Sequence, residues 1–122
     1  MKLETLIKRY AACGYKPRGL ERDLEVQSII HWLYDEYEIF VYVSYMSMNI
    51  NGTYQKFVGV YRYLQEVYSM FSCEKYFNNP NDAYFDTLRQ MQKGFVMKIK
   101  YGHLKKSKKN LRKHKLNKIT NK

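Results

Sequence analysis

The last 25 residues of the chain carry the side chains best suited to bind a ligand. From Lys98 to Lys122 the sequence has ten lysines, one arginine and no acidic residue, whereas residues 1–97 have 11 basic and 11 acidic residues. The whole net charge of +11 therefore lies at one end of the chain. Crowded ammonium groups repel one another, and a polyanion such as a nucleic acid or an anionic membrane surface relieves that repulsion.

The predominance of lysine in this segment indicates how it would bind. An ammonium group acts as a point charge on phosphate, whereas the flat guanidinium of arginine reads bases through paired hydrogen bonds. We therefore expect weakly specific contact with the backbone of RNA or DNA, with RNA slightly preferred. The candidate phosphate contacts are Lys98, Lys100, Lys105, Lys106, Lys108, Lys109, Arg112, Lys113, Lys115 and Lys118.

Aromatic side chains offer a second kind of contact with nucleic acid. Tyr42, Tyr61 and Tyr63 fall in predicted strands, and rings exposed on a sheet can stack on unpaired bases. The same spacing is also typical of half-buried sheet residues, so both interpretations stay open. The stretch KFVGVYRY (residues 56–63) departs from the RNA-recognition-motif pattern at most positions, which argues against that fold.

Catalytic and metal-binding chemistry has little support in the sequence. His31 and Asp35 lie one helical turn apart, a spacing typical of a surface pair. Cys13 and Cys73 stand 60 residues apart without a zinc-ligand pattern, as expected for isolated packing thiols. No Gly-rich phosphate loop, HExxH or GxSxG occurs. We predict a protein that is not an enzyme and needs no cofactor or metal.

The apolar segments predict a soluble, cytoplasmic protein. Glu4, Lys8 and Arg9 interrupt the apolar pattern of the first residues, unlike a signal peptide. The longest apolar run, Ile39 to Val43, is far shorter than the roughly 20 residues of a membrane span.

Helical spacing of apolar residues predicts two helices in the first third of the chain. The first covers residues 3–11 and ends near Gly14, and the second covers residues 24–37. The apolar face of the second helix leaves Glu25 and the pair His31 and Asp35 on the solvent side.

A β-hairpin is predicted next. Residues 38–48 and 54–64 are rich in β-branched and aromatic residues, and Asn51 with Gly52 between them favours a tight turn. Residues 65–77 fit either a third strand or a helix, and we favour the strand.

The last predicted helix has a clear start. Asn79 suits the N-cap, Pro80 the first helical position and Asp82 the first turn, and Gly94 should weaken the helix without ending it. The elements together predict an α+β fold of two layers, in which helices cover one face of an antiparallel sheet. We expect one domain over residues 1–101 and a basic tail over 102–122 that is disordered when unbound.

Two stretches carry a resemblance to known sequences. HWLYDEYEIFVYVSY (residues 31–45) and FNNPNDAYFDTL (residues 77–88) resemble short uncharacterised proteins of phages and mobile elements of gut bacteria. The resemblance covers about half of the chain and implies an α-β-β-α core. It implies no activity and no site.

The sequence thus predicts a small accessory protein that binds RNA or DNA phosphates through its lysine-rich arm. The alternative is a phage-type accessory protein that binds another protein through the tyrosine-rich surface of its body, with a tail that serves solubility. A tail attached to an anionic membrane is a further alternative, although such attachment normally needs an apolar anchor too.

Overall fold

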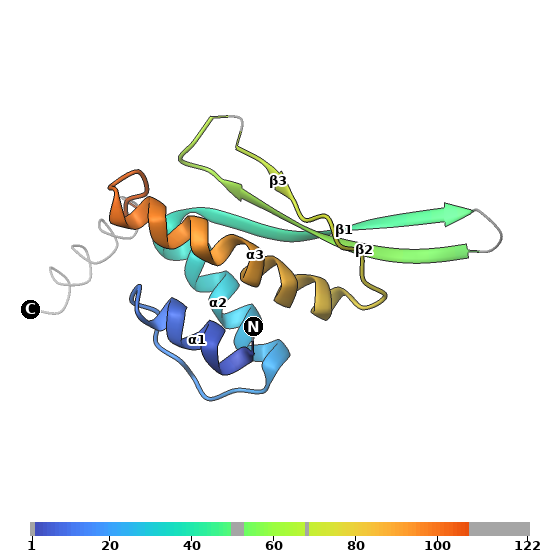
Figure 1. The fold of residues 1–122 in the computed structure, drawn as a ribbon, viewed down its shortest axis with the longest axis horizontal. Coiled ribbons are helices and arrows are strands. Elements are labelled where there is room, and N and C mark those ends of the chain that lie inside the picture. Colours follow the sequence, from blue (N-terminus) through green and yellow to red (C-terminus); the bar gives the residue numbers. More distant parts are fainter. Residues whose placement is uncertain (1, 50–52, 68, 108–122) are drawn as a thin grey trace, which may run out of the picture.

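The part of the chain that the structure describes combines three helices with a small antiparallel sheet. The computed structural model describes residues 2–49, 53–67 and 69–107. Its elements are α1 (Leu3–Ala11), α2 (Arg22–Tyr37), β1 (Ile39–Asn49), β2 (Thr53–Tyr63), β3 (Phe71–Ser72) and α3 (Pro80–Lys100). The strands are antiparallel in the order β1-β2-β3, and the helices lie on one side of them (Figure 1). The predicted α+β fold is confirmed.

The inner face of the sheet packs closely on α3. Tyr63 and Ile39 lie opposite each other on this face and are buried with Leu88 of α3 in the main core. The closest approach is at Gly59 in β2, where a Cβ atom would lie 1.6 Å from Oγ1 of Thr87. Only glycine therefore allows β2 and α3 to pack at this distance.

The start of α3 follows from local sequence signals, as predicted. The side chain of Asn79 accepts a hydrogen bond from the backbone N–H of Asn81 at 2.8 Å, and Pro80 occupies the first turn. Gly94 is exposed and the helix continues past it to Lys100. The predicted N-cap and the uninterrupted helix are both confirmed.

Glu25 in α2 lies inside the protein, so the prediction that it faces solvent was wrong. The residue is 1% exposed and its carboxylate accepts hydrogen bonds from the Tyr15 hydroxyl and from the backbone N–H groups of Arg18 and Gly19. Burial alone would raise the pKa of Glu25, but the hydrogen bonds outweigh it and lower the pKa. This carboxylate organises the segment between α1 and α2.

The third strand is much shorter than the predicted segment 65–77. Among the described residues of this segment, Phe71–Ser72 forms β3, and an isolated bridge joins Phe57 to Phe77. Ser69 explains part of the irregular course, because its hydroxyl takes the place of a backbone partner for the N–H of Tyr63. The predicted Asn51–Gly52 turn lies outside the described residues.

The β1–β2 hairpin extends well beyond the helical layer (Figure 1). On this outer stretch the rings of Tyr45 and Phe57 pack on each other with centroids 5.3 Å apart, and Tyr45 remains 51% exposed. The half of the hairpin near the turn thus has little helical support, a situation in which two paired strands are only marginally stable.

Candidate nucleic-acid interface

The basic segment begins on the last turn of α3 and continues past a helix stop at Gly102. Gly102 has a φ of +73°, a left-handed conformation that glycine adopts without strain. The backbone N–H groups of His103 and Leu104 then donate to the Lys98 carbonyl at 2.9 and 3.2 Å. Leu104 is 3% exposed and joins the main core. The chain therefore turns back onto the body after α3.

The folded domain ends later than the predicted boundary at residue 101. The side chain of Gln65 donates to the carbonyl of Lys105 at 2.6 Å and accepts from its N–H at 3.4 Å. Two residues on, the N–H of Ser107 donates to the Glu36 carbonyl at 2.6 Å and its hydroxyl to Glu38 at 3.3 Å. The expectation of a free tail directly after Gly102 is corrected, because residues 103–107 belong to the folded body.

Lys98, one of the predicted phosphate contacts, is already paired within the body. Its ammonium lies 2.5 Å from the Glu66 carboxylate and 4.8 Å from the centre of the Tyr63 ring. An opposite charge and a ring face both stabilise the cation where it stands. Lys98 therefore joins α3 to the segment after β2. The sequence did not predict this role, because Lys98 belongs to a run of basic residues.

The other described lysines of the segment remain exposed. Lys100 lies near the exposed ring of Tyr101, and Lys105 and Lys106 have exposed side chains beside the anchored backbone. The remaining predicted contacts are outside the described residues, namely Lys108, Lys109, Arg112, Lys113, Lys115 and Lys118.

The three tyrosines proposed to stack on bases do not form one platform. Tyr61 lies opposite Val41 and Tyr63 opposite Ile39, on the inner face of the sheet that packs on the helices. Tyr63 is only 2% exposed. Tyr42 lies opposite Val60 and faces the other way. The joint platform of Tyr42, Tyr61 and Tyr63 is therefore wrong.

A different aromatic pair lies on the outer face of the sheet, which we define as the face without helices. Phe40 is 46% exposed, and its ring lies 5.3 Å from that of Tyr42. Arg62, directly opposite Phe40 on β2, is exposed beside them. Phe40 and Arg62 lie at the end of the sheet where Glu38 holds Ser107, the last described residue of the basic segment. Alternation along β1 was the sequence signal that could have identified Phe40.

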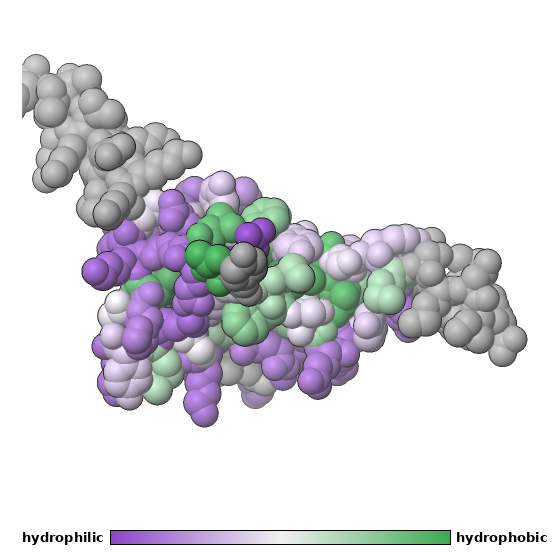
Figure 2. Space-filling view, turned by 90° about the horizontal axis from the view of Figure 1, so that it is seen from above, coloured by the Kyte–Doolittle hydropathy of each residue, from purple (hydrophilic) through white to green (hydrophobic). Residues whose placement is uncertain are grey.

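Apolar side chains continue along the outer face. Val58 and Val60 are buried at its centre although no described helix covers them, and Met46 and Met70 lie exposed around them. The Tyr42 hydroxyl approaches the Met70 sulfur at 3.8 Å. Figure 2, which views this face, shows hydrophobic side chains gathered at its centre with hydrophilic ones around them.

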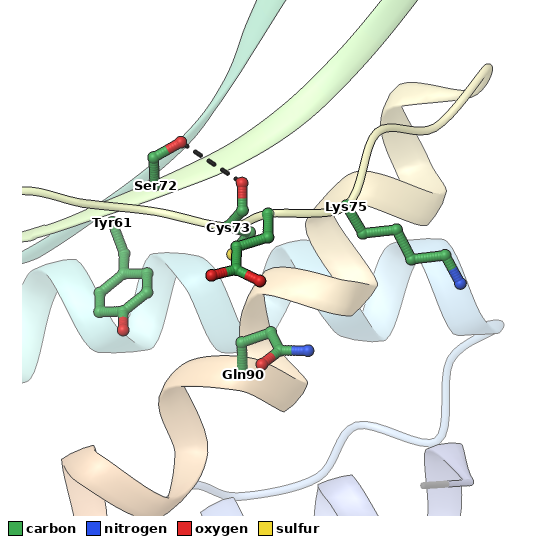
Figure 3. A pocket seen from close by; sticks show the side chains of 6 residues that line it. Tyr61, Ser72, Cys73, Lys75 and Gln90 are labelled. Atoms are coloured by element: carbon green, nitrogen blue, oxygen red, sulfur yellow. Dashed lines mark hydrogen bonds between the residues drawn. The ribbon is translucent and has the colours of Figure 1, made fainter.

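One hollow of the described residues contains a cysteine. A cavity of about 430 Å³ between the segment of β3 and α3 is lined by Tyr61, Cys73, Gln90 and their neighbours (Figure 3). Burial raises the pKa of the Cys73 thiol, which donates to the Thr87 hydroxyl at 3.9 Å. A buried neutral thiol is a poor nucleophile. His31 and Asp35, the other pair considered, are both exposed on α2.

The described residues also lack the groups that would hold a metal ion or cross a membrane. Residues 2–49, 53–67 and 69–107 contain no group of three His, Cys, Asp or Glu side chains placed to hold a metal ion. Among the helices described, none has the length and apolar character needed to cross a membrane.

Comparison with known proteins yields no relative. No family model, no curated protein and no solved structure matches the chain.

Proposed function

We propose that this protein is a non-enzymatic nucleic-acid-binding protein that grips RNA or DNA by the phosphate backbone through its basic C-terminal arm. The observation that carries the proposal is the charge distribution: 11 basic and no acidic residues follow Met97, and the residues before it are balanced. Phosphate contacts by such an arm release condensed counterions, which provides most of the affinity in binding of this kind.

The anchoring of residues 103–107 supports this proposal by the place it gives the arm. Hydrogen bonds of Lys105 with Gln65, and of Ser107 with Glu36 and Glu38, bring the chain to the end of the sheet where Phe40 and Arg62 lie. A strand of nucleic acid held by the arm would pass beside an exposed ring and a guanidinium. Both can stack on unpaired bases, which favours single-stranded RNA over duplex DNA.

The experiment measures binding of fluorescently labelled single-stranded RNA and duplex DNA by anisotropy at increasing NaCl. Six phosphate contacts would give a log-log salt slope of about −4 on a single strand and about −5 on duplex DNA. A chain that ends at Ser107 keeps its anchoring bonds and should lose most of the affinity. The matched control keeps the full length but changes the seven cations after Ser107 to glutamine.

Two results would overturn the proposal. One is an anisotropy that stays flat with the full chain in dilute buffer. The other is binding that is equally tight in molar salt, because counterion release requires the affinity to fall as salt rises.

The apolar outer face favours a second candidate function, the binding of another protein. The apolar surface of this face consists of exposed Phe40, Met46 and Met70 around buried Val58 and Val60. Exposed apolar surface of this kind marks interaction sites on small proteins. In this case a partner identified by co-purification should bind the chain ending at Ser107 as well as the full chain. Phe40→Ser with Met70→Ser should abolish that binding, and loss of binding on removal of the arm alone would exclude this candidate.

A further inference from the structure

The free edge of β1 presents unpaired backbone groups. β1 lies at one end of the strand order, so only one of its two edges is bonded to β2. The N–H of Leu64 donates to the Glu38 carbonyl at 3.0 Å, which makes residues 38 and 64 a hydrogen-bonded pair. Because bonding alternates along an antiparallel ladder, even-numbered residues of β1 bond to β2. Odd-numbered residues, including Val41, Val43 and Tyr45, point their N–H and C=O groups away from it.

This edge lacks the features that normally protect a strand from pairing with another chain. Its 11 residues, Ile39–Asn49, contain no charged residue and no proline, and they pair with β2 without a bulge. Natural edge strands are usually short, charged, interrupted by a bulge or covered. No described element lies along the free edge of β1 in the strand order. An edge of this length and composition is suited to accept another strand.

We propose that β1 pairs antiparallel with β1 of a second copy of this chain, so that two copies share one continuous six-stranded sheet. A two-fold axis at Ser44 aligns the whole of Ile39–Asn49 with its mate, since residue 44 is the midpoint of the strand. The same patch then serves both partners, as closed two-fold symmetry requires. Val41, Val43 and Tyr45 gain backbone partners in this arrangement.

The protruding hairpin is the reason to prefer a second copy over an unrelated strand. In the antiparallel pair, the half of β1 near the turn lies beside the partner's half near Ile39, which its α2 and α3 support from the inner face. Each body thus supports the part of the other hairpin that extends past its own helices. A short peptide added to the edge would leave that part as a narrow ribbon.

A groove beside the same edge fits this geometry. Ile30 and Tyr34 of α2 and Phe40 of β1 contribute to the lining of a mostly apolar groove of about 390 Å³. Tyr34 is 49% exposed, and its ring lies 6.3 Å from that of Phe40. A partner strand along β1 would cover this groove and bury apolar surface in addition to forming backbone hydrogen bonds.

Electrostatic repulsion does not oppose this pairing, because the pairing places the anchored starts of the two basic arms far apart. Ser107 is held at Glu38, and in the pair the two copies of Glu38 stand twelve positions apart, about 40 Å at 3.3 Å per residue. This distance is several times the Debye length of about 8 Å at physiological ionic strength, so the anchored residues 103–107 of the two copies scarcely repel each other.

The test is the mass of the full chain in solution, measured by sedimentation equilibrium over a range of concentrations in salt high enough to release nucleic acid. We expect a dimer. Ser44→Lys places two like charges directly opposite each other at the two-fold axis and should give a monomer. The matched control is Ser72→Lys, the same substitution on the exposed β3 at the other edge of the sheet, which should remain dimeric.

Amide hydrogen exchange provides the second measurement and shows that the variant is folded. In the native chain the N–H groups of Val41, Val43 and Tyr45 should exchange slowly, and in Ser44→Lys they should exchange fast. The N–H of Tyr42, which bonds to β2, should stay protected in both. A monomeric native chain, or equal weakening by Ser44→Lys and Ser72→Lys, would overturn the proposal. Neither result depends on nucleic acid, so this proposal and the proposed function can fail separately.

Discussion

The side-chain amide of Gln65 forms two hydrogen bonds with the backbone of Lys105, 40 residues further along the chain. The same amide nitrogen also donates to the Tyr37 carbonyl at 3.0 Å. One side chain thus connects the end of α2, the segment after β2 and the first residues of the basic arm. Gln65 therefore fixes the start of the arm on the body together with the bonds from Ser107 to Glu36 and Glu38.

Removal of this amide should release the start of the arm. In Gln65→Ala we expect trypsin to cut after Lys105 and Lys106 at least several-fold faster than in the native chain, because a protease needs an extended, unbonded backbone. Mass spectrometry of a digestion time course measures the rates. Gln90→Ala, at an exposed glutamine of α3, is the control. Equal cleavage rates in the native chain and Gln65→Ala would show that the amide does not hold this segment.

The contact between Gly59 and Thr87 predicts a large loss of stability on a small substitution. In Gly59→Ala the added Cβ would fall 1.6 Å from Thr87 Oγ1 and 3.1 Å from the Ala83 carbonyl, so β2 must move away from α3. We expect a cost of about 3 kcal/mol in the free energy of unfolding, measured with urea.

A second glycine provides the control for this substitution. Gly94→Ala meets no atom within 4 Å and should stabilise the helix by about 0.5–1 kcal/mol. Thr87→Ala should rescue part of the loss in Gly59→Ala, since it removes the nearest atom. An equally stable Gly59→Ala would contradict the close packing of β2 on α3.

Glu25 predicts a pH dependence of stability. Because its pKa is lowered in the folded protein, the ionised carboxylate stabilises the fold above its unfolded pKa, near 4.5, and this contribution is lost as pH falls through the lowered folded value. Glu25→Gln should lower the free energy of unfolding at pH 7 by about 1–3 kcal/mol, and the difference from the native protein should shrink below pH 4.

Urea unfolding at a series of pH values measures this effect. Glu21→Gln, which removes an exposed carboxylate at the start of the same helix, is the control and should show little change. A Glu25→Gln penalty of the same size at pH 3 and pH 7 would mean that the loss comes from packing and not from the charge.

Lysines in the basic segment should differ in their effect on nucleic-acid binding. Lys106→Gln removes an exposed cation and should reduce the salt slope by about 0.7 on a single strand. Lys98→Gln should leave the slope unchanged and instead destabilise the fold by up to about 1 kcal/mol, because it breaks the pair with Glu66. Anisotropy measures the salt slope of binding for both variants, and urea unfolding measures their stability. An equal change of slope would show that Lys98 does contact phosphate.

The sequence predicted correctly those elements that depend on contacts between residues close in sequence. The N-cap at Asn79 and the alternation of Ile39, Val41 and Val43 in β1 are of this kind, since the capping bond and the pleat involve only residues close in sequence. Glu25 could not be placed in the same way. Its partners, Tyr15 and the backbone near Gly19, lie in the irregular segment between α1 and α2, whose course no helix or strand pattern predicts.

The error over the tyrosine platform has a definite origin in the register of the hairpin. A two-residue turn at Asn51–Gly52 would pair Tyr42 with Tyr61 and place both rings on one face. The observed register pairs Asn49 with Thr53, which leaves three residues between them and pairs Tyr42 with Val60. A shift of one residue moves every side chain of a strand to the opposite face. Turn length, which composition does not determine, therefore decided which rings face solvent.

Glu38 joins α2 to β1 without a loop, in the left-handed conformation with a φ of 54°. Its carbonyl accepts from Leu64 and its carboxylate from Ser107, so three segments distant in sequence converge on it. An added or deleted residue here would rotate the strand relative to the helix and break both bonds. Natural length variation in this protein should therefore be confined to the hairpin tip, the surface loops and the region after Ser107, and the helix-to-strand junction should keep its length.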